Sequence, residues 1–346
     1  MKGKIIQVYA GLFAGVVLIF LTEKYNHLGR LPIWAVCLEL VIMIAALVVL
    51  FMPSYLLHKS SGGDVFSVLF SKNSASRMVL SSLYSLLFVL AAVRFISLYV
   101  EMLITAVNPQ ANQFVFAAGI IAVCAYASYK GVYTATRCAL ISFVIIAFSV
   151  VMIMLGNISG VELSNLYRSN NTAEFFNGAF SLLPVCILPV IFSVTSGSFS
   201  HSKRAFWGFA AIALITGGAL VFFMNTVLAD FADGRKFPYF ILGKNASFGQ
   251  TMGFDCLYLI CVTLCVFVLV SLFMACINET TGAKRSGKNT IMFSVLIFVM
   301  YICTEVFPKA KELVQNDVVF VIISAAYAVI LPTYAYIKFK RGCRNG

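Results

Sequence analysis

Charged residues are scarce in this sequence. Asp, Glu, Lys and Arg make up 11% of its 346 residues, and 61% are hydrophobic, whereas about 25% of an average soluble domain is charged. This balance excludes a water-soluble globular fold and predicts an integral membrane protein whose helices are buried in lipid and in one another. Nucleic-acid binding is excluded as well, because it requires a basic soluble surface.

Motifs for catalysis and metal binding are also lacking. The three histidines lie between the apolar segments, no nucleophile, base and orienting acid recur together, and no nucleotide-binding GxxxxGK[ST] is present. The ten cysteines show neither paired CxxC nor Cys/His spacing, so we interpret them as small buried hydrophobic residues. We expect no enzyme activity, no metal and no cofactor.

What the sequence has is long apolar runs. A membrane-spanning helix needs about 17 to 25 such residues, and we predict an all-α polytopic membrane protein with ten transmembrane helices in a single domain, residues 1–346. The ten segments are 5–21, 33–57, 78–107, 113–127, 138–156, 175–194, 205–230, 254–277, 289–305 and 317–338.

The basic residues predict the orientation of these helices. If the N-terminus is cytoplasmic, sixteen Lys and Arg residues fall on inner segments and eight on outer ones, while Arg94 lies inside a helix. Because basic residues are retained on the cytoplasmic side, this bias places both termini in the cytoplasm. Several acids, Glu305 and Asp317 among them, then fall near the outer face.

A weak internal repeat divides the chain into 5–156 and 175–338, with five helices each. The longest connection lies between the second and third helix of both halves, at 58–77 and 231–253. Five crossings give the halves opposite orientations, which predicts a 5+5 inverted repeat like that of leucine-transporter-like proteins.

The sixth segment contains Pro184 and Pro189, five residues apart. Each proline removes a backbone donor, so a continuous helix should be kinked or locally unwound there, and unpaired carbonyls at this depth need protein or a water-lined cavity. We therefore name Leu183, Pro184, Cys186 and Pro189 as candidate ligand-binding residues. The alternative is a kinked helix that serves packing alone.

The first segment contributes Gly11, Ala14 and Gly15. Small residues allow close approach to the helix backbone by a ligand or by another helix. Both interpretations remain open.

Arg94 is the main candidate for chemistry, because a charge in the middle of a membrane helix costs about 2.5–3.5 kcal/mol. Glu101 lies on nearly the same helical face but roughly 10 Å along the axis, too far for a direct ion pair, and Glu39 in the second helix is the other candidate partner. Arg94 either binds a ligand carboxylate or locks helices together.

Three stretches resemble a known family: LLHKSSGGDVFSVLF leading to VRFISLYVEML, then YASYKGVYTATRCALISF, and KFPYFILGKNASFGQTMGFDCLYLICVTLCVFVLVSLFMA. They are similar to the B subunits of spore germination receptors, in the amino acid/polyamine/organocation permease superfamily. The positions that match the pattern are Lys130, Gly131, Arg137, Phe237, Pro238, Gly249 and Asp255. The first helix departs from it, because no proline precedes Pro32.

The resemblance implies the leucine-transporter-like fold and a pocket for a small germinant, usually an amino acid, between the first, third, sixth and eighth helices. Phe95, Tyr99 and Thr263 would then be wall residues. It also implies A and C partner subunits in the spore inner membrane. We expect structural or coupling roles for Asp255, which matches the family pattern, and for Glu39 and Glu101, the acids considered beside Arg94.

Three functions follow from this sequence. The first is a receptor subunit that binds a germinant within the membrane and signals to its partners. The alternative is an ion-coupled secondary amino-acid transporter, although the eighth helix offers only Thr263 and Ser271 and no central acid. The third is a scaffold subunit with a degenerate pocket.

Overall fold

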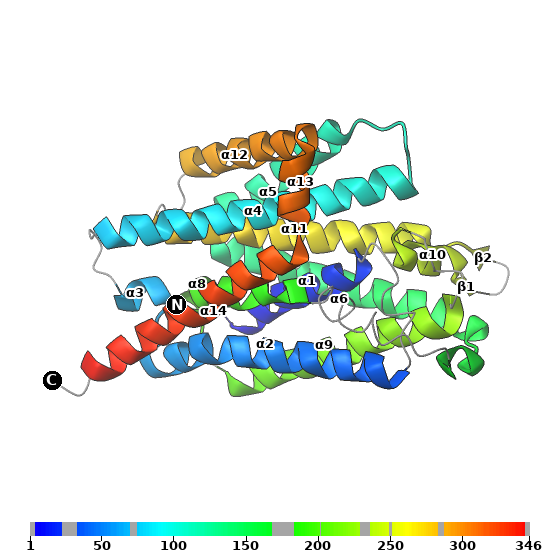
Figure 1. Ribbon diagram of the computed structural model, residues 1–346, viewed down its shortest axis with the longest axis horizontal. Helices are drawn as coiled ribbons and strands as arrows, with labels where there is room; N and C mark the ends of the chain where they lie inside the picture. Colours follow the sequence, from blue (N-terminus) through cyan, green and yellow to red (C-terminus); the bar gives the residue numbers. More distant parts are fainter. Residues whose placement is uncertain are drawn as a thin grey trace.

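The chain folds into a bundle of long helices (Figure 1). The computed structural model describes residues 4–22, 33–69, 75–167, 183–200, 202–228, 236–248, 251–282 and 287–342, and some residues within these ranges, Glu39 among them, by their backbone alone. The elements are α1 (Ile6–Leu21), α2 (Ile33–Ser61), α3 (Val65–Leu69), α4 (Ala75–Ala106), α5 (Gln113–Tyr129), α6 (Val132–Gly156), η2 (Ile158–Gly160), η3 (Leu163–Tyr167), η4 (Leu183–Cys186), α8 (Ile187–Thr195), η5 (Ser196–Ser198), α9 (Lys203–Phe223), the π-helix η6 (Met224–Leu228), α10 (Pro238–Asn245), β1 (Ser247–Phe248), β2 (Thr251–Met252), α11 (Asp255–Thr280), α12 (Gly287–Val306), α13 (Pro308–Gln315) and α14 (Asp317–Gly342).

Seven of the described helices are long and apolar enough to cross a membrane: α2, α4, α6, α9 with η6, α11, α12 and α14. Three shorter apolar helices accompany them, at Ile6–Leu21, Gln113–Tyr129 and Leu183–Ser198. The prediction of an all-helical integral membrane protein is thereby confirmed. The first part of the predicted sixth segment, residues 175–182, lies outside the described residues.

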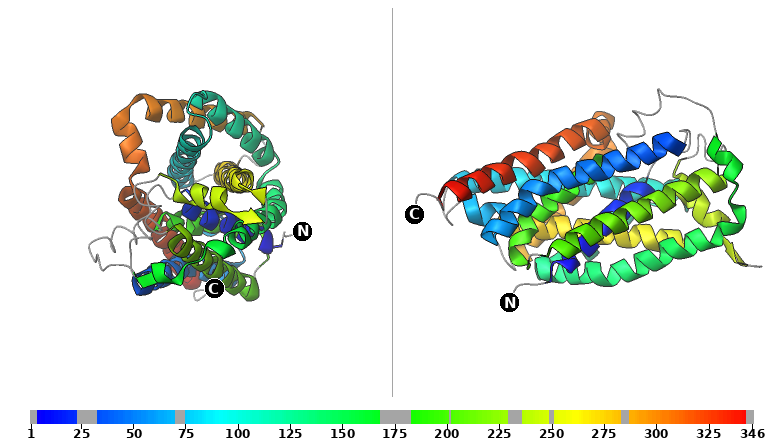
Figure 2. Two further views of the ribbon diagram at one scale, coloured as in Figure 1. Left: turned by 90° about the vertical axis from the view of Figure 1, so that its right-hand side faces the viewer. Right: turned by 90° about the horizontal axis from the view of Figure 1, so that it is seen from below.

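The core of the bundle is built around α11. This helix packs against α1, α4, α5 and α6, and α4 and α11 are the most deeply buried of the seven long helices. The surrounding helices expose large apolar side chains such as Tyr126, Ile141 and Ile215, as a lipid-facing surface requires. The right-hand view of Figure 2 shows the long helices side by side, and the left-hand view looks along the bundle.

Helix α1 is continuous, and its glycines are occupied by neighbouring side chains. A Cβ at Gly11 would lie 2.5 Å from Leu272 Cδ1, and one at Gly15 would lie 2.6 Å from Leu188 Cδ2. The small residues therefore let α11 and α8 approach α1 closely. Of the two interpretations of the first segment, the described structure shows helix packing.

Two short helices occupy the long connections between transmembrane segments. Helix α3 lies between α2 and α4, and α10 with the β1–β2 hairpin lies between α9 and α11. They stand at opposite ends of the bundle (Figure 1). Lys338 near the end of α14 donates to Leu69 O at 2.9 Å and so ties α14 to α3.

Gly15→Leu should destabilise the protein, because the added side chain would have to displace Leu188 and Leu269 from a closed interface. We expect a loss of about 1–3 kcal/mol, as for other overpacked cores, measured by unfolding of the purified protein in detergent. Gly119→Leu on α5 is the matched control, since a Cβ there meets nothing within 4 Å. Equal stability of the two variants would contradict the packing role of Gly15.

Candidate functional site

Polar side chains form a line along one face of α4, at Arg94, Ser97 and Glu101. Residues three, four and seven apart lie on one side of a helix, so the three point the same way. Arg94 and Ser97 are buried, with 4% and 2% of their surface exposed. The facing segment is α13 with the flanking ends of α12 and α14. We call this group of residues and their partners the α4 polar line.

Arg94 is held by the turn between α13 and α14. Its Nη2 donates to Asp317 Oδ1 and forms an ion pair with that carboxylate. Its Nη1 donates to Val314 O at 3.0 Å, and its Cζ lies 4.7 Å from the centre of the Phe320 ring. The positive charge is thus met by a carboxylate, a carbonyl dipole and an aromatic face, the three kinds of partner that a partly buried guanidinium favours.

The structure gives Arg94 a partner that the sequence did not single out. Among the described side chains its partner is Asp317, not Glu101, and the side chain of Glu39 in α2 lies outside the described residues. The sequence analysis placed Asp317 among acids near the outer face. That carboxylate has 44% of its side-chain surface exposed while the side chain of Arg94 has 5%, so the ion pair joins a buried cation to a solvent-accessible anion.

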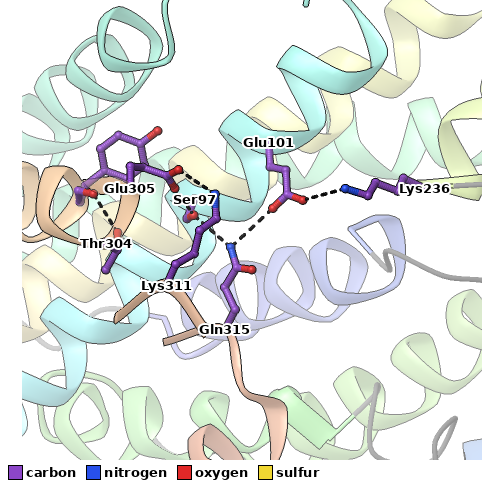
Figure 3. A network of polar contacts seen from close by, with 8 residues as sticks. Ser97, Glu101, Lys236, Thr304, Glu305, Lys311 and Gln315 are labelled. Carbon is purple, nitrogen blue, oxygen red and sulfur yellow. Dashed lines mark hydrogen bonds and ion pairs between the residues drawn. The ribbon is translucent and has the colours of Figure 1, made fainter. Parts of the chain in front are cut away.

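Glu305 at the end of α12 forms the second part of the polar line. Its Oε1 accepts from Ser97 Oγ at 2.8 Å, and its Oε2 pairs with Lys311 Nζ at 2.7 Å. Only 8% of the Glu305 side chain is exposed. A carboxylate this deeply buried needs such partners to stay charged, and here both of its oxygens have one (Figure 3).

Glu101 forms the third part, nearest the end of the bundle that carries α10. Gln315 Nε2 donates to Ser97 Oγ at 3.1 Å and lies 3.5 Å from Glu101 Oε2. Lys236 Nζ lies 3.6 Å from Glu101 Oε1. Gln315 therefore bridges the second and third parts, and Lys236 connects them to the start of α10 (Figure 3).

Local sequence explains why α13 lies across α4. Pro308 follows Phe307 and begins α13 at its first turn, where the missing N–H is not needed. Eight residues later Asn316 Oδ1 accepts from Val319 N at 3.1 Å and caps α14, and Asp317 in its first turn complements the helix dipole. The short helix turns the chain sharply (Figure 1) and brings Val314 O, Gln315 and Asp317 to α4.

The turn that presents Lys236 is strained. Phe237 has φ 55° and ψ 61°, the left-handed region, and is the one described non-glycine residue with positive φ. A bulky residue adopts this conformation only where its surroundings enforce it. Phe237 is fully buried and Pro238 begins α10 directly after it, so the turn beside Glu101 is held by core packing.

The candidate residues of the sixth segment lie where a 3-10 turn is followed by an α-helix. Leu183–Cys186 forms the 3-10 turn η4, and α8 follows from Ile187. Pro189 is in the first turn of α8, where backbone N–H groups have no intrahelical acceptor, so neither proline breaks an α-helical ladder in the described part. Pro184 and Cys186 are buried.

The three predicted wall residues divide into two places. Phe95 is buried and stacks on Phe273 at 6.1 Å between ring centres. Tyr99 Oη and Thr263 Oγ1 lie 3.1 Å apart in a hydrogen bond, beside a cavity of about 470 Å³ between α4, α5 and α11. Asp255 lies in the first turn of α11, where its Oδ1 accepts from Cys256 N at 3.0 Å; this is a helix-starting role.

Sequence reasoning did not place six side chains in the polar line: Ser97, Lys236, Glu305, Lys311, Gln315 and Asp317. Two signals point to four of them, Ser97, Lys311, Gln315 and Asp317. One is the spacing of Arg94, Ser97 and Glu101 on one helical face. The other is the polar stretch PKAKELVQND at 308–317 between two apolar helices, which is too long for a tight turn and matches the length of a short crossing helix.

Asp317→Asn should destabilise the protein by about 1–3 kcal/mol, between the values for exposed and buried ion pairs, because it leaves the Arg94 charge without an anion. Unfolding in denaturant measures the loss. Lys236→Gln is the control: its pair with Glu101 is longer, at 3.6 Å, and 47% of its side chain is exposed, so we expect under about 1 kcal/mol. Equal losses of unfolding free energy in the two variants would show that the Arg94–Asp317 pair stabilises the protein no more than the exposed pair does.

Comparison with known proteins adds no family assignment. No protein-family model matches the sequence, and no curated protein matches it. A function for this chain therefore has to be argued from the geometry of the α4 polar line and from the resemblance of the three sequence stretches.

Proposed function

We propose that the chain is a ligand-sensing membrane receptor subunit of the spore germination receptor B type, with ten membrane-spanning helices in a 5+5 inverted repeat and both termini in the cytoplasm. Three features support the fold. The first helices of the two halves, α1 and α8 with η4, touch one another, and so do α4 and α11. The short helices α3 and α10 follow equivalent helices of the two halves and stand at opposite ends of the bundle (Figure 1).

One observation carries the functional proposal: the buried Arg94 is neutralised by a carboxylate that is 44% exposed on its side chain. In this proposal a small solute with a carboxylate, such as an amino acid, enters from the end that carries α10 and replaces Asp317 on the guanidinium. Arginine binds planar carboxylates bidentately, so the exchange conserves the charge balance at Arg94. The solute is then sensed as a competitor for an existing ion pair.

The exchange supplies a signal, because the displaced Asp317 belongs to the turn that positions α13 and α14. A ligand changes a conformational equilibrium only through contacts that differ between the two states, and here the difference is the ion pair itself. Gln315, two residues before Asp317, links the same turn to Ser97 and Glu101. Release of the turn would move α14, and with it the surface offered to partner A and C subunits.

The proposed ligand site lies at Arg94, away from the first and sixth segments. The glycines of α1 are filled by Leu272 and Leu188, which leaves the backbone there to helix packing. Arg94 keeps the ligand role that the sequence analysis considered for it. The other role considered for Arg94 was to hold helices together. In this proposal the Arg94–Asp317 ion pair does so in the ligand-free state, and the ligand breaks it.

A secondary amino-acid transporter is the second candidate, favoured by the buried Glu305. Acids inside a membrane domain serve as proton carriers in many transporters. Here Ser97 donates to Glu305, and Gln315 donates to Ser97 and to Glu101, so two carboxylates lie in one hydrogen-bonded group. In this alternative Glu305 would carry the proton that is coupled to solute movement.

Two variants test the receptor site in opposite directions. Purified protein is mixed with single amino acids, and ligand-induced thermal stabilisation reports binding. Arg94→Ala should abolish the stabilisation. Asp317→Asn should tighten apparent affinity by about tenfold, equivalent to about 1.4 kcal/mol, because the internal competitor for Arg94 is removed.

The direction of the second effect distinguishes a ligand site from a structural lock. If Arg94 and Asp317 only hold helices together, the Asp317→Asn protein is less stable and no amino acid rescues it. Unchanged stabilisation of Arg94→Ala would also refute the proposal. Gradient-driven uptake by proteoliposomes would favour the transporter, whereas binding without uptake favours the receptor.

A further inference from the structure

A cavity far from the polar line lies between the first parts of α1, α6 and α9. Its volume is about 570 Å³, and its lining includes Lys4, Tyr9, Phe13, Arg204 and Phe209. Its lining residues include some in the first turns of α1 and α9. None of its lining residues belongs to the α4 polar line.

The polar and apolar parts of this cavity are separated. The polar lining residues cluster where α1 and α9 begin: Lys4, Ser200, Ser202 and Arg204. The side chains deeper in the bundle are aromatic or aliphatic, as at Phe13 and Ile212. The nine steps along the chain from Lys4 to Phe13 and the eight from Arg204 to Ile212 cover about 12–14 Å at 1.5 Å per residue, close to half of the ~30 Å hydrocarbon core of a bilayer.

The basic end carries no compensating acid within the described part of the chain. Neither Lys4 nor Arg204 takes part in an ion pair there. Trp207, one turn after Arg204, is 59% exposed, as is typical of tryptophan at the boundary between headgroups and acyl chains. These residues match an anionic headgroup at the level of the membrane surface.

The apolar walls are made of aromatic rings that pack against one another. Tyr9 stacks on Phe209 at 5.4 Å between ring centres, and Phe13 meets Phe143 edge-on at 5.0 Å. Tyr9 and Phe209 also take part in an aromatic cluster with Phe192 and Phe51. Gly208 opens the cavity on the α9 side, because a Cβ there would meet nothing within 4 Å.

We propose that this cavity is a binding site for one anionic membrane phospholipid. Its phosphate lies against Lys4 and Arg204, and one acyl chain extends along Phe13, Phe143 and Ile212. A zwitterionic lipid offers the same chain but a headgroup without net charge, and a free phosphate offers the charge without the chain. The site requires both.

The test counts lipids on the intact protein. The full chain, purified in detergent, is incubated with dioleoyl phosphatidylglycerol or dioleoyl phosphatidylcholine, and native mass spectrometry measures the fraction that retains one lipid. We expect retention of phosphatidylglycerol over phosphatidylcholine. Arg204→Ala and Lys4→Ala should each lower phosphatidylglycerol retention about fivefold, the effect of roughly one basic residue near a membrane surface.

A cavity-filling variant tests the apolar part. Gly208→Phe places a ring in open space and should abolish retention while the protein stays folded, as its unfolding temperature will show. Ile215→Phe is the matched control on the same helix: Ile215 is 69% exposed and does not line the cavity. It should retain lipid like the unaltered protein.

Three results would overturn the proposal. Equal retention by Gly208→Phe and Ile215→Phe would place the lipid elsewhere. Equal retention of the two lipids, unaffected by Arg204→Ala, would remove the role of the basic end. Displacement of phosphatidylglycerol by inorganic phosphate at equal concentration would mean that the acyl chain contributes nothing.

Discussion

The ion pair between Arg94 and Asp317 constrains much of this structure. An unpaired guanidinium buried in α4 would be costly, because removing a charge from water carries a large desolvation penalty. The anion comes from the start of α14, and the short helix α13 leads the chain from the end of α12 to that point. The ion pair therefore ties the start of α14 to the middle of α4.

The same constraint separates the two sides of α4. One side packs into the core through residues such as Phe95, which stacks on Phe273 of α11. The other carries Arg94, Ser97 and Glu101 toward α13 and the flanking helix ends, where Asp317, Glu305 and Gln315 hold them by an ion pair and hydrogen bonds. Packed apolar surfaces resist continuous deformation, whereas ion pairs and hydrogen bonds can be exchanged for equivalent ones. Movement in response to a solute is therefore expected on the polar side, and α11 with α1 serves as the fixed frame.

The sequence predicted the helices well, because hydrophobic run length is set by bilayer thickness and needs no tertiary information. The seven long helices all coincide with predicted segments. The sequence also singled out Arg94, because the free-energy cost of a charge in the middle of a membrane helix is evident without tertiary information. It did not predict Asp317 as the partner, because the ion pair spans 223 positions and depends on how α13 turns. The distribution of charged residues among the connections placed Asp317 at the end of a connection, and it does begin α14. Such a distribution does not indicate which residue elsewhere in the chain Asp317 contacts.

The small residues of α1 show a different limit. Gly11 and Gly15 mark a close approach to the backbone in either interpretation, and only the identity of the approaching group separates a ligand cradle from a helix interface. The approaching atoms are the methyl groups of Leu272 and Leu188, which come from α11 and α8. Because most residues of both helices are apolar, composition does not indicate which apolar side chain will fill the space. A buried charge is more informative than a small residue for this reason: its partner must be polar, and in a chain with 11% charged residues few candidates exist.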